Sequence, residues 1–143
     1  MKIKLYLDID GVLLRSDRVG ETKLIPNIKE FLEYTRKHYN CFWLSTHSRY
    51  SAEDVRKYLA PYFKKAGLNC ELIGHIKALP WKTLKTEAID FSSPFIWIDD
   101  APLPSEIEVL REKKREKCLL HLATHITPLR RSRRRLHRFP RDS

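Results

Sequence analysis

Short apolar runs that stop abruptly at acidic residues are the feature that most constrains the fold of this chain. The run at residues 3–7 ends at Asp8, and the fully apolar run at residues 95–98 ends at Asp99. Strands that are buried on both faces of a parallel sheet have this continuous apolar character. Between the runs lie longer segments whose apolar residues recur with a period near 3.6, as in helices that connect parallel strands. The alternation predicts an α/β fold.

Further strands and helices are expected at regular intervals along the chain. Three more short apolar runs complete the predicted sheet, at residues 41–44, 70–73 and 118–122. Helices are predicted at residues 28–39 after Pro26, at residues 51–67 with Ser51 as the N-cap, and at residues 80–91 and 105–117. The expected architecture is a three-layer, doubly wound, Rossmann-like sandwich around a mainly parallel five-stranded sheet.

The composition is that of one folded domain, which we expect to span residues 1–128. The chain has 143 residues, of which 42% are hydrophobic and 32% are charged, so wholesale disorder and collagen-like structure are excluded. No apolar run approaches the roughly 18 residues of a membrane helix. Asp8 interrupts the N-terminal apolar segment before it could form the core of a signal peptide. We therefore expect a cytoplasmic protein that has no membrane contact.

The net charge of +10 is concentrated at the C-terminus. Residues 129–143 contain seven arginines and one acid, which account for six of the ten charges. This segment is predicted to be a basic C-terminal tail or a terminal helix. Arginine suits phosphate by charge and by its forked geometry, so the tail could contact nucleic acid or polyphosphate. A solvated terminus is the other interpretation, and the sequence does not separate the two.

Polar residues follow the C-terminal ends of three predicted strands. They are Asp8 and Asp10, Ser45 and Thr46, and Asp99 and Asp100. Ligands of open parallel sheets bind outside the carboxyl ends of the strands, so these three groups should converge at one edge. Crowded carboxylates repel each other unless a cation joins them, and Mg²⁺ prefers oxygen ligands of this kind. The sequence therefore predicts a magnesium site at this edge of the sheet.

In this order the motifs resemble those of phosphatases of the haloacid dehalogenase (HAD) superfamily. The resemblance spans residues 2–102 and rests on four motifs: Asp8-Ile-Asp10-Gly11 after the first strand, Ser45 after the second, a lysine ahead of the next strand, and Asp99-Asp100. It implies a phosphoric monoester hydrolase that depends on Mg²⁺ and forms an aspartyl-phosphate intermediate. The acid at position 10 favours a phosphatase, because the superfamily's ATPases carry threonine there and its dehalogenases lack this acid.

The resemblance also implies a role for each acidic residue. Asp8 is the expected nucleophile, and Asp10 is the expected general acid and base. The Asp8 carboxylate, the Asp10 carbonyl oxygen and Asp99 would hold Mg²⁺. Asp100 would bind the metal directly or through water, or would orient Lys85.

Phosphate binding is expected from the second and third motifs. Ser45 would bind the phosphoryl oxygens, with Thr46 as the alternative. The lysines that could serve as the third motif are Lys77, Lys82 and Lys85. Lys85 fits best because it lies one helical turn from the apolar pair Ala88-Ile89, and so beside the predicted buried face. His47 and Arg49 could touch substrate, but we interpret them as exposed polar residues at the start of a helix.

Segment lengths leave no room for a separate cap domain. The 30 residues between Gly11 and Phe42 suffice for a flap and one helix. A capless core leaves the phosphate site open, so the predicted substrates are phosphorylated small molecules, nucleotides or nucleic-acid ends. The alternative is a non-catalytic HAD-like protein that binds phosphate, or nucleic acid through its arginine-rich tail. The presence of both Asp8 and Asp10 counts against that alternative.

Overall fold

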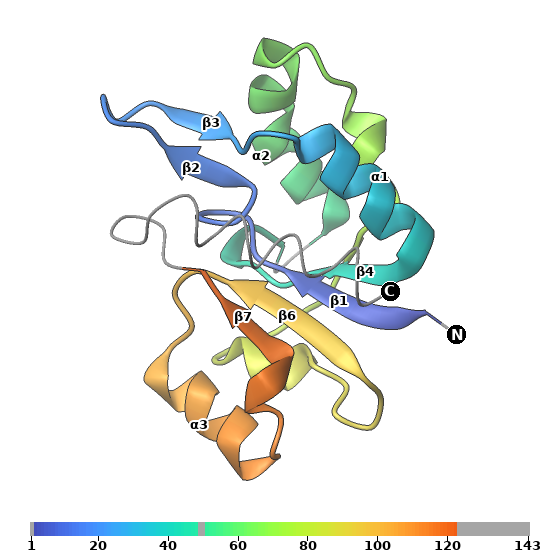
Figure 1. Cartoon of the computed structure of the whole chain (residues 1–143), viewed down its shortest axis with the longest axis vertical. Helices are drawn as coiled ribbons and strands as arrows, with labels where there is room; N and C mark the ends of the chain where they lie inside the picture. Colours follow the sequence, from blue (N-terminus) through green and yellow to red (C-terminus); the bar gives the residue numbers. More distant parts are fainter. Residues whose placement is uncertain (1, 49–50, 123–143) are drawn as a thin grey trace.

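The computed structural model describes residues 2–48 and 51–122, and its central element is a parallel sheet (Figure 1). Five strands of the described residues form this sheet in the order β5-β4-β1-β6-β7, and every neighbouring pair is parallel. The strands are β1 (Ile3–Leu7), β4 (Tyr39–Trp43), β5 (Lys77–Ala78), β6 (Phe95–Asp99) and β7 (Leu119–His121). The predicted α/β class and mainly parallel five-stranded sheet are confirmed.

The winding of the chain reverses direction beside β1. From β1 the chain continues to β4 and β5 on one side, and then crosses to β6 and β7 on the other side. Residues Leu7 and Ile98 are partners in the β1–β6 ladder, and the amide of Asp8 donates to the carbonyl of Ile98 at 3.0 Å. The ends of β1 and β6 therefore flank a topological switch point, the place where open α/β sheets bind ligands.

Helices cover both faces of the sheet (Figure 1). Helices α1 (Ile28–His38) and α2 (Ala52–Lys65) contribute buried side chains to one core, and α3 (Pro104–Glu112) contributes to the other. Successive side chains of a strand point to opposite faces, so Leu5 and Leu7 join the first core while Tyr6 joins the second. The layered arrangement is compatible with a Rossmann-like sandwich.

Helix α2 begins at the predicted cap. The hydroxyl of Ser51 accepts a hydrogen bond from the amide of Asp54 at 3.1 Å, which satisfies one of the unpaired amides of the first turn. Val55, Leu59 and Phe63 follow at intervals of four residues and are fully buried. This spacing packs one face of α2 on the sheet.

The predicted strand at residues 70–73 is wrong, because this segment forms the 3-10 helix η2 (Cys70–Ile73). The side chain of Asn69 accepts the amide of Glu71 at 2.8 Å, which caps the helical turn. The edge strand is instead β5, two residues long, which pairs with Phe42 and Trp43 of β4.

The last two predicted helices are shorter than expected. Within residues 80–91 there is only the 3-10 helix η3 (Lys85–Ala88), because the carboxylate of Glu87 accepts the backbone amides of the preceding three-residue segment 82–84 and holds it as a loop. Within residues 105–117, α3 ends at Glu112 and is followed by η4 (Glu116–Cys118). Lys114 adopts a φ of 58° between them, a value that interrupts a right-handed helix.

A two-stranded antiparallel hairpin occupies the chain between β1 and α1. It consists of β2 (Leu14–Ser16) and β3 (Thr22–Leu24). An ion pair between Lys65 of α2 and Glu21 connects the hairpin to the helix. This hairpin lies in the segment between Gly11 and Phe42 for which the sequence predicted a flap and one helix.

The predicted tail at residues 129–143 lies outside the described residues, as does Arg49. In the part of the chain that the structure describes, no helix has both the length and the apolar character needed to cross a bilayer.

Candidate functional site

Three carboxylates meet where β1 and β6 end. Asp8 follows β1, Asp99 is the last residue of β6, and Asp100 comes next. One carboxylate oxygen of each lies within 4.8 Å of the others. Asp99 is fully buried, and the side chain of Asp8 is only 10% exposed. The structure thus brings these three predicted site residues together.

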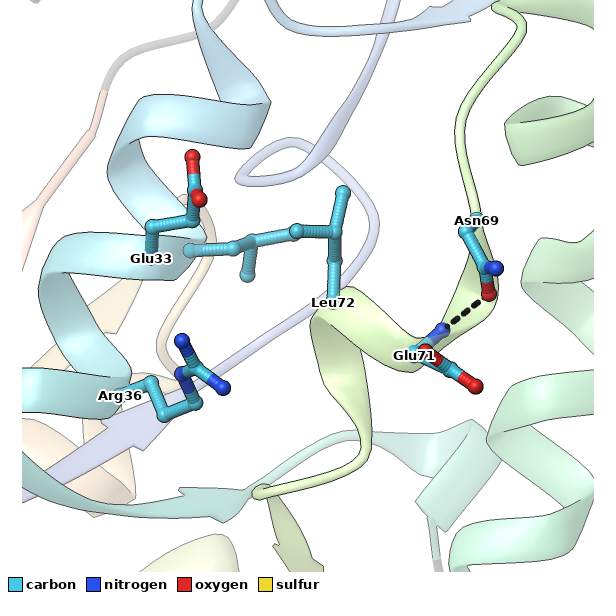
Figure 2. Close-up of a pocket in the computed structure, with 6 residues that line it drawn as sticks. Glu33, Arg36, Asn69, Glu71 and Leu72 are labelled. Atoms are coloured by element: carbon cyan, nitrogen blue, oxygen red, sulfur yellow. Dashed lines mark hydrogen bonds between the residues drawn. The ribbon is translucent and has the colours of Figure 1, made fainter.

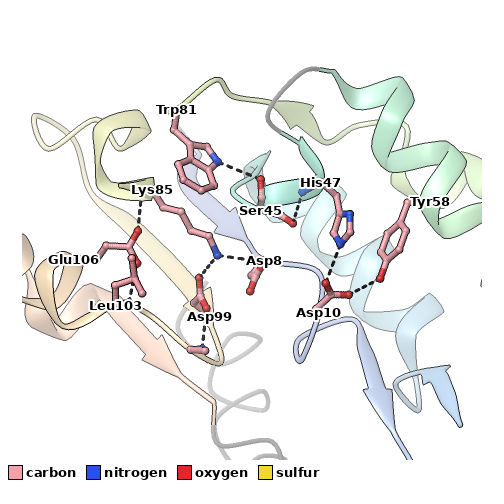
Figure 3. Close-up of polar contacts among 11 residues, drawn as sticks. Asp8, Asp10, Ser45, His47, Tyr58, Trp81, Lys85, Asp99, Leu103 and Glu106 are labelled. Carbon is pink, nitrogen blue, oxygen red and sulfur yellow. Dashed lines mark hydrogen bonds and ion pairs between the residues drawn. The ribbon is translucent and has the colours of Figure 1, made fainter. Parts of the chain in front are cut away.

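Among the three candidate lysines, Lys85 is the one that contacts this cluster (Figure 3). Its Nζ lies 2.7 Å from Oδ2 of Asp99 and 3.4 Å from Oδ1 of Asp8. Lys77 is exposed on β5, and Lys82 is exposed in the loop that Glu87 organises. The geometry therefore favours Lys85 as the lysine of the site.

The cluster holds three carboxyl groups and one ammonium, that of Lys85, so it would carry excess negative charge if all three carboxyl groups were ionised. Burial, and then the charge of Asp99, raise the pKa of Asp8 to about 8, although Lys85 acts in the opposite direction. Burial and the charge of Asp99 also raise the pKa of Asp100. A cation bound among these carboxylates would relieve their mutual repulsion.

Gly11 allows the chain to turn directly beside Asp100. Its φ is +82°, in the left-handed region that glycine adopts without strain. A Cβ atom at this position would lie 2.0 Å from Oδ2 of Asp100. Position 11 therefore requires glycine both for the backbone turn and for the space that the Asp100 carboxylate occupies.

The carboxylate of Asp10 is held by two aromatic side chains (Figure 3). Its Oδ2 lies 2.8 Å from Nε2 of His47, and the Tyr58 hydroxyl donates to its Oδ1 at 2.7 Å. The two rings stack with centroids 3.7 Å apart and an interplanar angle of 14°. Burial, and then the hydrogen bond to Asp10, raise the pKa of Tyr58, so the phenol keeps its proton. The interpretation of His47 as an exposed polar residue is wrong, because it is partly buried and bonded to Asp10.

Ser45 follows the end of β4, the strand next to β1. The amide of Leu44 donates to the carbonyl of Leu7 at 2.7 Å and extends the ladder between the two strands. Ser45 is buried, its hydroxyl accepts the amide of His47 at 3.2 Å, and its carbonyl accepts Nε1 of Trp81 at 3.1 Å. The alternative residue Thr46 is exposed in the 3-10 helix η1 (Thr46–Ser48).

Glu106 is a buried residue of this region that the sequence analysis did not single out. Its carboxylate accepts the backbone amide of Lys85 at 2.6 Å and the amide of Leu103 at 2.8 Å (Figure 3). It therefore joins the start of α3 to the segment that carries the site lysine. The available signal was a glutamate at the third helical position, behind Pro104 at the first, which is typical of a helix N-terminus.

A separate pocket lies between α1 and η2 (Figure 2). Its lining residues are Leu32, Glu33, Arg36, Asn69, Glu71 and Leu72. None of the predicted site residues belongs to it.

The carboxylate cluster combines the oxygen ligands of a hard cation with a lysine that can face an anion. A phosphate ester that binds together with a divalent cation would match this combination of cation ligands and lysine.

Comparison of the chain with protein-family models, curated proteins and solved structures found no match.

Proposed function

We propose that this protein is a Mg²⁺-dependent phosphatase of the capless HAD type, which hydrolyses phosphate monoesters. The observation that carries the proposal is the group of buried Asp8 and Asp99 with partly buried Asp100 and Lys85 at the topological switch point of the sheet. In this proposal the hairpin β2–β3 would be the flap of the core, and only residues 25–27 separate it from α1, which leaves no cap domain between them.

The donor chemistry of the cluster fits Mg²⁺, a hard cation that prefers carboxylate and carbonyl oxygens. Asp8, Asp99 and the carbonyl oxygen of Asp10 would hold it, with Asp100 bound directly or through water. Burial, and then the charge of Asp99, raise the pKa of Asp8, and a bound cation would oppose both effects by favouring the ionised carboxylate. When bound, Mg²⁺ would offset the negative charge shared by the carboxylates and the phosphoryl group.

The residues of the chain would divide the reaction into two displacements. A carboxylate oxygen of Asp8 attacks phosphorus and the bond to the leaving oxygen breaks, while Asp10 donates a proton to that oxygen. Water then attacks the aspartyl-phosphate and gives a proton back to Asp10, which releases phosphate and regenerates Asp8. Lys85 and Ser45 would stabilise the phosphoryl oxygens during both steps.

The absence of a cap between these elements favours substrates that extend beyond a closed pocket. We propose phosphorylated small molecules, nucleotides or nucleic-acid ends as the substrate class. The arginine-rich segment 129–143 favours the polyanionic members of this class by its charge.

Replacement of Asp8 tests the proposed function. We expect the wild-type protein to hydrolyse an aryl phosphate only in the presence of Mg²⁺. The D8N variant should lose at least about 10³-fold in kcat while keeping its fold, because a neutral amide neither attacks phosphorus nor balances a cation. The matched control E112Q removes an exposed carboxylate from the end of α3 and should keep wild-type activity.

Two results would contradict the proposal. One is appreciable turnover by D8N, which would exclude Asp8 as the nucleophile. The other is the absence of Mg²⁺-dependent hydrolysis by the wild type with a panel of aryl phosphates, nucleotides and end-phosphorylated oligonucleotides. Binding of these ligands without turnover would then support the non-catalytic alternative.

A further inference from the structure

The side chain of Asp10 has a more defined orientation than its exposure would suggest. It is 57% exposed, and an exposed aspartate in a turn ordinarily rotates among several conformers. Here one carboxylate oxygen contacts His47 and the other accepts from Tyr58, at 2.8 and 2.7 Å. Two hydrogen bonds to opposite oxygens of one carboxylate fix both its position and its plane.

The two groups that hold Asp10 are themselves fixed by the fold. The amide of His47 is bonded to the hydroxyl of Ser45, directly after β4. Tyr58 belongs to α2, between Val55 and Leu59, which are fully buried in the core. The stacked rings also restrain each other, since their centroids are only 3.7 Å apart. The orientation of Asp10 is thus set by η1, which follows β4, and by α2 rather than by its own turn.

We propose that His47 and Tyr58 form a clamp, the Asp10 clamp, that positions the Asp10 carboxyl group for proton transfer to the leaving oxygen of an unactivated alkyl phosphate. This inference rests on the proposed phosphatase function and deepens it. Each carboxylate oxygen has two acceptor positions, so a hydrogen bond from the clamp leaves room for the transferred proton. His47 and Tyr58 are positioning residues, because they act through Asp10.

The clamp has a consequence for the class of substrate. An aryl phosphate releases a stable phenolate and needs little proton donation, whereas an alkyl phosphate releases a basic alkoxide and needs a well-placed acid. A positioned general acid contributes about 10²- to 10⁴-fold to such a reaction. A displacement of the acid by about 1 Å can lower the reaction rate by about 10²-fold. Because the clamp fixes the position of the acid Asp10, the substrates that benefit most are phosphate esters of alcohols, such as sugar or nucleoside phosphates.

The test compares two substrates with the same variants at saturating Mg²⁺: an alkyl phosphate and an activated aryl phosphate. Tyr58→Phe keeps the stacked ring and removes the hydroxyl donor, and His47→Ala removes the other partner. We expect each variant to lower kcat for the alkyl phosphate by about tenfold to hundredfold. The loss for the aryl phosphate should be much smaller, and KM should change little for either substrate.

Two further variants make the comparison specific. His47→Gln retains a side-chain N–H that can reach Asp10, and should recover a large part of the kcat that His47→Ala loses. Tyr62→Phe removes a hydroxyl one turn further along α2 and should behave as wild type with both substrates. Thermal unfolding midpoints show whether each variant is folded. If His47→Ala is destabilised, Tyr58→Phe decides the outcome, because it conserves the ring.

The failure of the clamp and the failure of the proposed function give different results. Equal losses for alkyl and aryl phosphates, or no loss for either, would overturn the clamp while the wild type still shows Mg²⁺-dependent hydrolysis. A wild type that hydrolyses neither substrate would overturn the phosphatase function, and the clamp with it.

Discussion

The histidine at position 75 shows how one side chain can make the stability of this fold depend on pH. Its Nε2 lies 3.2 Å from Oγ1 of Thr35, and the hydroxyl of Thr35 already donates its one hydrogen to the carbonyl of Leu32 at 2.8 Å. Thr35 must therefore accept from His75, which places the imidazole hydrogen on Nε2. Nδ1 is left as a bare nitrogen, buried without a hydrogen-bond partner among the described residues.

We expect the variant His75→Gln to have a weaker pH dependence of stability than the wild type between pH 6.5 and 4. Burial, followed by the charges of Arg36 and Lys2, lowers the pKa of His75 from 6.5 to about 4. Above pH 6.5 the imidazole is neutral in the folded and the unfolded chain. Below it the unfolded chain binds the proton first, so the free energy of unfolding falls as the pH falls through this window. Urea denaturation of both proteins at pH 7 and pH 5 measures the difference, and equal losses would contradict it.

At the scale of elements, α3 and η3 are joined through the single buried carboxylate of Glu106. We expect E106Q to lower the free energy of unfolding by about 1–3 kcal/mol. The amide nitrogen of glutamine would face one of the two backbone N–H groups, at Lys85 or Leu103, and leave it unsatisfied. Chemical denaturation at pH 7 measures the change.

The control for the contact that Glu106 makes between α3 and η3 is E108Q, on the same helix. Glu108 is exposed and pairs with Arg111 at the surface, so its replacement should change the free energy of unfolding by less than about 1 kcal/mol. If E106Q is as stable as E108Q, the buried carboxylate does not hold the two elements together.

At the scale of the whole molecule, the dominant feature is the unequal distribution of charge along the chain. We expect truncation after Pro128 to weaken the binding of an oligonucleotide and to reduce its dependence on salt, because seven arginines are removed. Hydrolysis of an aryl phosphate should persist, since every candidate site residue precedes position 128. Fluorescence anisotropy at 50 and 200 mM salt, values that bracket the physiological range, measures binding.

The outcome distinguishes the two interpretations of residues 129–143. Equal binding by the truncated and full-length proteins at both salt concentrations would contradict the nucleic-acid contact and favour a solvated terminus. Loss of folding on truncation would instead indicate a terminal helix whose apolar residues pack on the domain.

The sequence by itself determined four of the five strands of the sheet and the meeting of its acidic ends; the edge strand β5 was not predicted. A continuous apolar run such as residues 95–98 favours a strand with both faces covered, and the helical segments between the runs favour a parallel sheet. Once β1 and β6 are such strands, their carboxyl ends share one edge, and Asp8 and Asp99 meet there. The local signals at residues 70–73 and 80–91 were weaker, because short apolar segments suit helix and strand alike. Side-chain caps from Asn69 and Glu87 decided their conformation.

Only the tertiary structure decided what holds the site residues in place. His47 and Tyr58 are 37 and 48 residues from Asp10 in the sequence, and Glu106 is 21 residues from Lys85. A hydrogen bond holds only within a narrow range of distance and angle, and no local pattern encodes the separation of groups on different elements. These contacts exist because the packing of α2 and α3 on the two faces of the sheet brings the groups within reach.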